Sequence, residues 1–294
     1  MTEAGDIRAI DAVVNIWTKE ALAHRPDWSR EFFVRKMRMD ESLAVGLSLE
    51  QMIERMDRAG IGHAFLVAAK AGRIGLPGCY HMPYSVVADA VRRHPQRFSG
   101  LLGIDPTTGM AGLREFAVAV QEHGFIGAHF YPHWFEIEPD HALMYPYYAR
   151  CCELGVPIQV QVGQSMIYSK AHRTRSVGRP ITLDAVACDF PELRLIGIHV
   201  GVPWTDEMIA MAWKHENVFI GSDAHSPKYW PESFVRYLDT YGREKVLFGT
   251  DFPVLDFERT RTEIEALKLG TDTLRALLRD NVIRVYRLDR KTGL

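Results

Sequence analysis

Short apolar runs alternate with amphipathic segments along most of the chain. The runs are bounded by Gly, Pro or polar residues, whereas the segments between them repeat apolar positions at helical spacing. Uninterrupted apolar runs of this kind are typical of parallel strands that are buried on both faces. We therefore predict strands at residues 7–17, 63–69, 98–104, 124–130, 157–162, 193–199, 217–220 and 245–251.

Helical patterns follow most of these strands. Ser48 and Gln51 have the spacing of a capping box, before a helix that ends at Gly60. A Gly/Pro-rich loop at 70–84 precedes a helix that runs through Val91. The remaining helices are predicted at 112–122, 142–154, 181–190, 205–215, 263–267 and 274–278.

This alternation continues without a linker, which predicts an α/β fold over residues 1–294: a single (β/α)8 TIM barrel with long loops at its C-terminal face. A doubly wound open sheet is the alternative. It is disfavoured because no Gly-x-Gly-x-x-Gly turn follows a strand. Residues 18–46 form a long connection without clean periodicity, and the aromatic residues within it favour an ordered lid.

Composition narrows the class of protein. The chain has 294 residues, 47% hydrophobic and 24% charged, which suits a soluble globular protein with a large core. A net charge of −2 gives no general attraction to nucleic acid or to an acidic membrane surface, and no apolar run is long enough to span a bilayer. The four cysteines have neither zinc spacing nor a disulfide pattern, and no secretory leader is evident. We expect a cytoplasmic protein with no nucleic-acid or membrane partner, and the sequence leaves open whether it forms a homo-oligomer.

Polar and ionisable residues stand at or just after the ends of several predicted strands. In a barrel of this type these ends share one pocket. Each residue alone is equally well explained as a hydrogen-bonded core or loop residue, and residues 131–134 as a packed loop, but their recurrence on independent strands predicts a site. The candidates are Asn15, His129, Tyr131, His133, Gln161, His199, Asp223, His225 and Asp251.

Four stretches carry a resemblance to a known family. They are Phe-Pro-Glu-Leu-Arg at 190–194 with His-Val-Gly-Val-Pro-Trp at 199–204, Met-Asp-Arg-Ala-Gly at 56–60, His-Pro-Gln-Arg-Phe at 94–98 with Asp105-Pro106, and Leu-Phe-Gly-Thr-Asp-Phe-Pro at 247–253. The chain resembles the amidohydrolase-related superfamily, in the branch of aminocarboxymuconate semialdehyde decarboxylase, aromatic-acid decarboxylases and a dicarboxylate lactonase. The resemblance implies a (β/α)8 barrel with its active site at the carboxyl ends of the strands.

The chain departs from this family at the metal ligands. The family's first strand ends Asp-x-His-x-His, whereas this chain has Val13 and Asn15 at the two histidine positions, and Gln161 replaces the histidine of the fifth strand. Of that set only Asp251 remains, beside His199 of the sixth strand. Valine cannot coordinate a metal and amides are poor zinc ligands, so we expect no metal and no other cofactor. A relocated site that uses His129, His133 or His225 is the alternative.

Without a metal to activate water, the resemblance to the lactonase implies a hydrolase acting on an activated ester or lactone of a small cyclic or aromatic carboxylate. Asp251 would be the general base and His199 the acid or the oxyanion stabiliser. A carboxy-lyase acting on an aromatic acid is the second reading of the same two residues. A barrel that binds a ligand without turning it over is the third.

Basic residues in two loops suggest a small anionic substrate. Arg35 and Arg38 lie in the first connection, and residues 170–179 follow the fifth strand. A solvated basic loop is the alternative explanation. The second loop contributes Lys170, His172, Arg173, Arg175 and Arg179, and Trp204 together with Trp134 would line the pocket.

Overall fold

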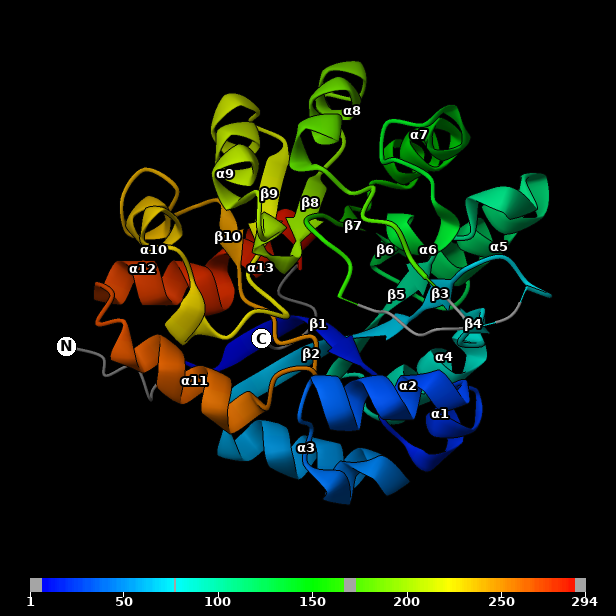
Figure 1. Cartoon of the computed structure of the whole chain (residues 1–294), viewed down its shortest axis with the longest axis horizontal. Coiled ribbons are helices and arrows are strands. Elements are labelled where there is room, and N and C mark those ends of the chain that lie inside the picture. The colour runs from blue at the N-terminus through cyan, green and yellow to red at the C-terminus, as the bar shows by residue number, and fades with distance from the viewer. Residues whose placement is uncertain (1–6, 77, 167–172, 289–294) are drawn as a thin grey trace.

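Eight parallel strands form one sheet that curves into a barrel (Figure 1). The computed structural model describes residues 7–76, 78–166 and 173–288. In order around the sheet, the strands are β1 (Ala9–Asn15), β2 (Ile61–Ala68), β5 (Phe98–Gly103), β6 (Gly127–Phe130), β7 (Ile158–Gln161), β8 (Leu195–Ile198), β9 (Val218–Gly221) and β10 (Val246–Leu247).

Backbone hydrogen bonds close the barrel between β1 and the chain that follows β10. Ala12 N donates to Phe248 O at 3.0 Å, and Asp251 N donates to Val13 O at 2.8 Å. Every neighbouring pair of strands in the sheet is parallel. The predicted TIM barrel is therefore confirmed, and the open doubly wound sheet is excluded.

Helices cover the outer surface of the sheet (Figure 1). The capping box before α3 is present, because the Ser48 hydroxyl accepts from Gln51 N and the Gln51 side chain accepts from Ser48 N. The helices of this layer are α3 (Leu49–Arg58), α4 (Tyr84–Arg93), α5 (Met110–Gln121), α7 (Tyr145–Leu154), α8 (Leu183–Asp189), α9 (Thr205–Lys214), α10 (Glu232–Asp239), α11 (Phe257–Ala266), α12 (Thr271–Arg275) and α13 (Asn281–Tyr286).

Loops between strands and helices carry further short elements. The connection at 18–46 contains α1 (Lys19–Ala23) and α2 (Asp27–Glu31), and the Gly/Pro-rich loop contains the hairpin β3 (Lys70–Ala71) and β4 (Tyr80–His81). A single turn, α6 (Pro132–Phe135), follows β6. The expected lid is thus an ordered, partly helical segment.

Two element predictions were wrong in ways that affect the site. The eighth strand is regular only over 246–247, because Phe248 N leaves the sheet and donates to Leu277 O, so Asp251 lies in a turn beyond the strand. The sixth strand ends at Ile198, and His199 begins a tight 3-10 turn.

Helix α10 was not predicted, although Phe234, Tyr237 and Leu238 form its buried face.

No helix among residues 7–76, 78–166 and 173–288 is both long and apolar enough to cross a membrane.

Candidate active site

The site is centred on His199, which stands between two carboxylates at the carboxyl ends of neighbouring strands. Its Nε2 lies 3.2 Å from Asp223 Oδ2 and 3.7 Å from Asp251 Oδ2. Asp223 is fully buried, and its other oxygen accepts from the backbone N–H of His199 at 3.1 Å. Asp223 therefore fixes both the backbone and the ring of His199.

The backbone around this group is bent to aim the side chains. His199 and Asp251 both have positive φ, at 70° and 55°, as do the adjoining Val200 and Ala224, at 57° and 65°. Non-glycine residues adopt this left-handed region at a cost, and they cluster at functional sites.

Two amides hold the central residues from the neighbouring strands. Asn15 Nδ2 donates to Asp251 Oδ1 at 2.8 Å and to Phe252 O at 3.1 Å. Gln161 Nε2 lies 3.0 Å from His199 Nδ1. A primary amide offers both a donor and an acceptor, so Gln161 can serve either protonation state of the ring after a 180° turn. Asp251 Oδ2 is the carboxyl oxygen that Asn15 leaves unbonded.

Burial and charge set the protonation of these groups. Burial raises the pKa of Asp251 to about 7, and the repulsion of Asp223 adds to this while His199 opposes it. For Asp223, burial alone would raise the pKa, but the charge and hydrogen bonds of His199 outweigh it and hold the pKa below its usual range. For His199 burial acts against the cation, yet Asp223 and Asp251 raise the pKa above its usual value. Near neutral pH Asp251 is therefore partly protonated, and the two acidic neighbours of His199 favour its imidazolium form.

Arg25 supplies a second cation, and it was not among the predicted site residues. It lies between α1 and α2, and its Nη2 donates to Asn15 Oδ1 at 2.9 Å. Its guanidinium is 4.5 Å from the ring centroid of Trp17, 4.9 Å from that of Tyr80 and 5.3 Å from that of Phe33. Arg25 Nε is buried and has no hydrogen-bond partner among the residues that the structure describes.

A pocket opens above this centre. Its wall contains six of the predicted site residues, and Arg25 and a group of aromatic rings complete it. The six predicted residues are Asn15, Tyr131, Gln161, His199, His225 and Asp251. The aromatic residues are Trp28, Phe32, Phe33, Tyr80, Tyr131 and Trp134.

Two predicted residues lie behind the pocket wall. His129 is fully buried, its Nδ1 is 2.8 Å from Gln159 Oε1, and its ring packs edge-on against Tyr131. Burial lowers the pKa of His129 to about 4, so its ring is neutral at pH 7. Asp223 is the other residue, and it reaches the pocket only through His199. His225, which does line the pocket, is also neutral, because burial and the charge of His199 lower its pKa to about 4.

Three predicted binding residues lie elsewhere. His133 and Arg173 line a separate cavity beside the β3–β4 hairpin. Trp204 packs beneath the guanidinium of Arg179, which forms an ion pair with Glu207. None of the three lines this pocket, and their role in binding substrate stays a prediction.

Two arginines of the predicted basic loops form ion pairs with acidic side chains. Arg175 pairs with Glu136 at 3.8 Å, and Arg35 pairs with Glu31 on the surface. Arg38 is exposed and is not part of the pocket wall. Lys170 and His172 lie outside the described residues. The arginine that lines the pocket is Arg25, which belongs to neither of the two basic loops predicted to bind an anionic substrate.

Comparison with known proteins places the chain in a family. The amidohydrolase family model matches residues 10–288. The chain belongs to this family. A search of curated proteins finds no match.

Solved structures share the fold at low sequence identity. An uncharacterised TIM-barrel protein from Bordetella bronchiseptica has a TM-score of 0.75 and 21% identity, over 98% of this chain and all of its own. A 5-carboxyvanillate decarboxylase from Novosphingobium aromaticivorans, solved with manganese and 4-hydroxy-3-methoxy-5-nitrobenzoic acid, has a TM-score of 0.68 and 16% identity, over 96% of this chain and 97% of its own. A 2,6-dihydroxybenzoate decarboxylase from Rhizobium has a TM-score of 0.67 and 16% identity, over 96% of this chain and 99% of its own.

The residues of this family member do not suit the divalent metal that the family implies. The Asn15 amide nitrogen, a donor, points at Asp251, and its oxygen is taken by the cationic Arg25. His199, Asp223 and Asp251 do bring three donor atoms within 4.8 Å of one another. Their approach is accounted for by the ion pairs of His199 with Asp223 and Asp251. A divalent ion would add two positive charges to a buried group that already contains His199 and adjoins the Arg25 guanidinium.

Proposed function

We propose that this protein is a carboxy-lyase that removes CO₂ from a small hydroxylated aromatic acid, with Asp251 as the proton donor. One observation carries the proposal: a buried carboxyl with a pKa of about 7 adjoins an aromatic pocket that also holds a guanidinium. The decarboxylases of carboxyvanillate and dihydroxybenzoate that share this fold support the same chemistry.

The pocket suits such a substrate in shape and charge. Planar rings pack well against aromatic walls, and a guanidinium binds carboxylates through paired N–H groups. Arg25 donates one N–H to Asn15, and its buried Nε has no partner within the described part of the chain, so the guanidinium has N–H groups left for an anion. Tyr131 stays a phenol at neutral pH, because burial and the charge of Asp251 hold its pKa well above the usual value, and it is therefore a hydrogen-bond donor.

The proposed step needs only the aromatic carboxylate and one proton, which solvent replaces after each turnover. Asp251 transfers its proton to the ring carbon that carries the carboxylate. The bond between that carbon and the carboxylate then breaks, its electron pair returns to the ring, and CO₂ leaves. Asp251 regains a proton from water. A ring hydroxyl favours the first transfer because it donates electron density to the carbon that accepts the proton.

His199 would support this step through its charge beside the Asp251 carboxyl. Its imidazolium lies 3.7 Å from Asp251 Oδ2 and stabilises the carboxylate that forms when the proton leaves. Asp223 holds the ring in position and keeps it charged. Because the ligand set does not suit a divalent ion, no step of the proposal passes through a metal.

Hydrolysis of an activated ester or lactone is the second candidate. With a pKa of about 7, Asp251 is also partly ionised at neutral pH and can accept a proton from water. Two of the solved structures named above are decarboxylases, and none is named as a hydrolase of esters or lactones. Decarboxylation is therefore the first candidate here and hydrolysis the second, which reverses the order predicted from the sequence.

A substrate panel separates the two candidates. Purified protein would be incubated with hydroxylated benzoates and, in parallel, with lactones of similar size, and CO₂, phenols and ring-opened acids would be measured by mass spectrometry. We expect CO₂ and the matching phenol in equal amounts from at least one benzoate. Ring opening of a lactone, with no CO₂ from any benzoate, would overturn the proposal.

A further inference from the structure

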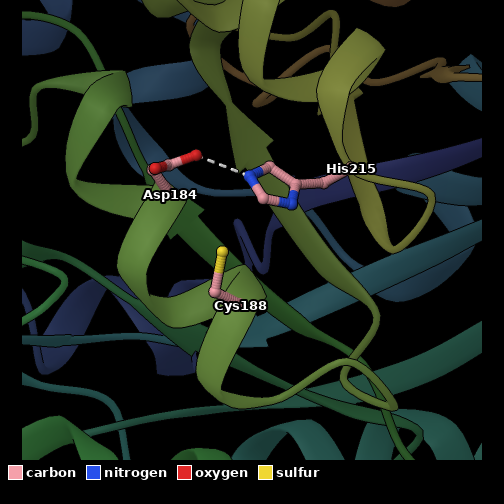
Figure 2. A group of neighbouring side chains, drawn as sticks. All are labelled: Asp184, Cys188 and His215. Carbon is pink, nitrogen blue, oxygen red and sulfur yellow. Dashed lines mark hydrogen bonds and ion pairs between the residues drawn. The ribbon is translucent and has the colours of Figure 1, made fainter.

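A second group of side chains that can bind a metal lies away from the pocket. Asp184 and Cys188 are one turn apart on α8, so they share a face of that helix, and His215 follows the last residue of α9. Figure 2 shows the three side chains converging in the space between the two helices. One donor atom from each lies within 4.8 Å of the others.

The imidazole is already held in place for binding. The His215 side chain is only 9% exposed, and its Nε2 lies 2.6 Å from Asp184 Oδ1. Cys188 is exposed, and Asp184 is partly exposed. An ion that joined the group would meet one ordered nitrogen, one oxygen and one sulfur, and solvent could reach its remaining position.

We propose that Asp184, Cys188 and His215 bind one zinc-type divalent ion, with water as the fourth ligand. Imidazole nitrogen, thiolate sulfur and carboxylate oxygen are the donors that zinc takes in proteins, usually in a tetrahedral arrangement. Binding releases the thiol proton of Cys188 to solvent, and His215 binds as the tautomer with its proton on Nδ1, so that Nε2 is free for the metal. Two bonds to the metal then replace the hydrogen bond between His215 and Asp184. The nitrogen and oxygen must then move apart by about 0.7 Å to reach the spacing of tetrahedral ligands.

Lys214 opposes this binding. Its Nζ lies 2.6 Å from Asp184 Oδ1, the same oxygen that His215 contacts. The ammonium therefore competes with the metal for Asp184 and repels it. Replacing Lys214 by an uncharged residue of similar length should tighten binding, a response that simple attachment of metal to an exposed thiol would not give.

The bound ion would join α8 to α9, the helices on either side of β8 in the chain. A ligand that binds only the folded state stabilises it, so the ion should raise the melting temperature. None of the three residues lines the pocket, and the site is independent of the proposed decarboxylation.

Cobalt titration tests the site through its sulfur ligand. The full-length protein, treated with chelator and then freed of it, would be titrated with Co²⁺, because a thiolate bound to cobalt gives a charge-transfer absorption that oxygen and nitrogen ligands do not. We expect one equivalent of this absorption, with displacement by Zn²⁺. Cys188→Ser should abolish it, whereas the matched control Cys152→Ser, a half-buried cysteine on α7, should retain it. Lys214→Met should lower the dissociation constant several-fold.

Two results of the cobalt titration would overturn the proposal. One is the absence of the charge-transfer absorption in the unaltered protein, and the other is its persistence in Cys188→Ser. Metal that is bound without a sulfur signature, and is lost in Asp251→Asn, would instead belong to the pocket. It would contradict both this site and the metal-free reading of the active site.

Discussion

At the scale of residues, the site depends on a few side chains held at unusual backbone angles. His199 and Asp251 lie in the left-handed region, where a non-glycine residue costs on the order of 1–3 kcal/mol. Hydrogen bonds from Asn15 to Asp251 and from His199 to Asp223 keep both in place. The strain places the two groups 3.7 Å apart at the mouth of the barrel.

Replacing Asp251 by Asn tests its role as the proton donor. The substitution keeps the size of the side chain and removes its transferable proton, so we expect kcat to fall by about 10²–10⁴-fold with little change in KM. Steady-state kinetics on a verified substrate measures this. The loss in His199→Asn should not add fully to it, because the two residues act as a unit. Near-normal turnover in Asp251→Asn would move the role to His199, the other ionisable residue of this centre that lines the pocket.

The pH profile distinguishes an acid from a base at the same residue. Asp251 has a pKa of about 7, so a proton donor is active below that pH and is lost as the pH rises through it. We expect kcat/KM for decarboxylation to fall through about pH 7, and this limb to disappear in Asp251→Asn. A profile that rises through the same pH would show that Asp251 works as a base and would favour hydrolysis.

At the scale of elements, the segment between β1 and α3 determines which ligands fit. Helices α1 and α2 carry Arg25 to the pocket, and the aromatic rings of Trp17, Phe33 and Tyr80 surround its guanidinium. The ordered lid expected from the aromatic content of 18–46 therefore forms part of the pocket wall.

Arg25→Gln should weaken substrate binding. A hydrogen bond to a charged group contributes about 1.5–3 kcal/mol, so KM for a carboxylate should rise by about 10–100-fold with a smaller effect on kcat. Arg35→Gln is the matched control, because this arginine is in the same segment, is exposed and pairs only with Glu31 among the described residues. Equal effects of the two substitutions would remove Arg25 from the site.

The sequence predicted the barrel because the strand and helix periods recur along the whole chain. It predicted much of the site because the carboxyl ends of parallel strands share one mouth, which brought Asn15, Gln161 and His199 together. It missed Arg25, because the segment around that residue has no periodicity and its position depends on how α1 and α2 pack over the barrel. It assigned Arg173 to the pocket from charge alone, although the side chain lines another cavity.

Asp251 shows a subtler limit. The apolar run before it predicted a strand end, but the regular strand stops at Leu247. Thr250 donates from its backbone and its hydroxyl to the buried Asp11, which stabilises a turn where the pattern predicted a strand. Local patterning does not reveal such a bond, because the two residues are 239 positions apart.

At the scale of the whole molecule, buried ionisable groups make stability depend on pH. Burial raises the pKa of Asp11 to about 8 and that of Asp251 to about 7. The pKa of His199 is raised as well, by its two carboxylates against the effect of burial. Between about pH 6.5 and 8 these groups give the folded protein more protons than the unfolded chain, so stability falls as the pH rises. Lys245, whose pKa burial lowers to about 8, opposes this trend toward the upper end of the range.

Below pH 6.5 stability falls as the pH falls. Burial lowers the pKa of four histidines, so the unfolded chain gains protons there that the folded protein does not. These four histidines outnumber the two buried aspartates. These are His63, His129 and His225, at about 4, and His133, at about 3.

We therefore expect the free energy of unfolding to be greatest near pH 6.5 and to drop by about 1–2 kcal/mol by pH 8. Urea denaturation across this range measures it. In Asp11→Asn the drop above pH 6.5 should become smaller, because one of the protons involved is gone. An unchanged slope in that variant would show that Asp11 does not titrate there.

Decarboxylation in D₂O by chelator-treated protein tests most directly whether the protein is a metal-independent decarboxylase with Asp251 as the proton donor. We expect CO₂ to be released at the rate of the untreated protein, and each molecule of product to carry one deuterium at the carbon that lost its carboxylate. Asp251→Asn should release CO₂ and form labelled product about 10²–10⁴-fold more slowly. Loss of CO₂ release on chelation, with recovery when manganese is added back, would contradict metal-independent decarboxylation, because the reaction would then require a divalent ion.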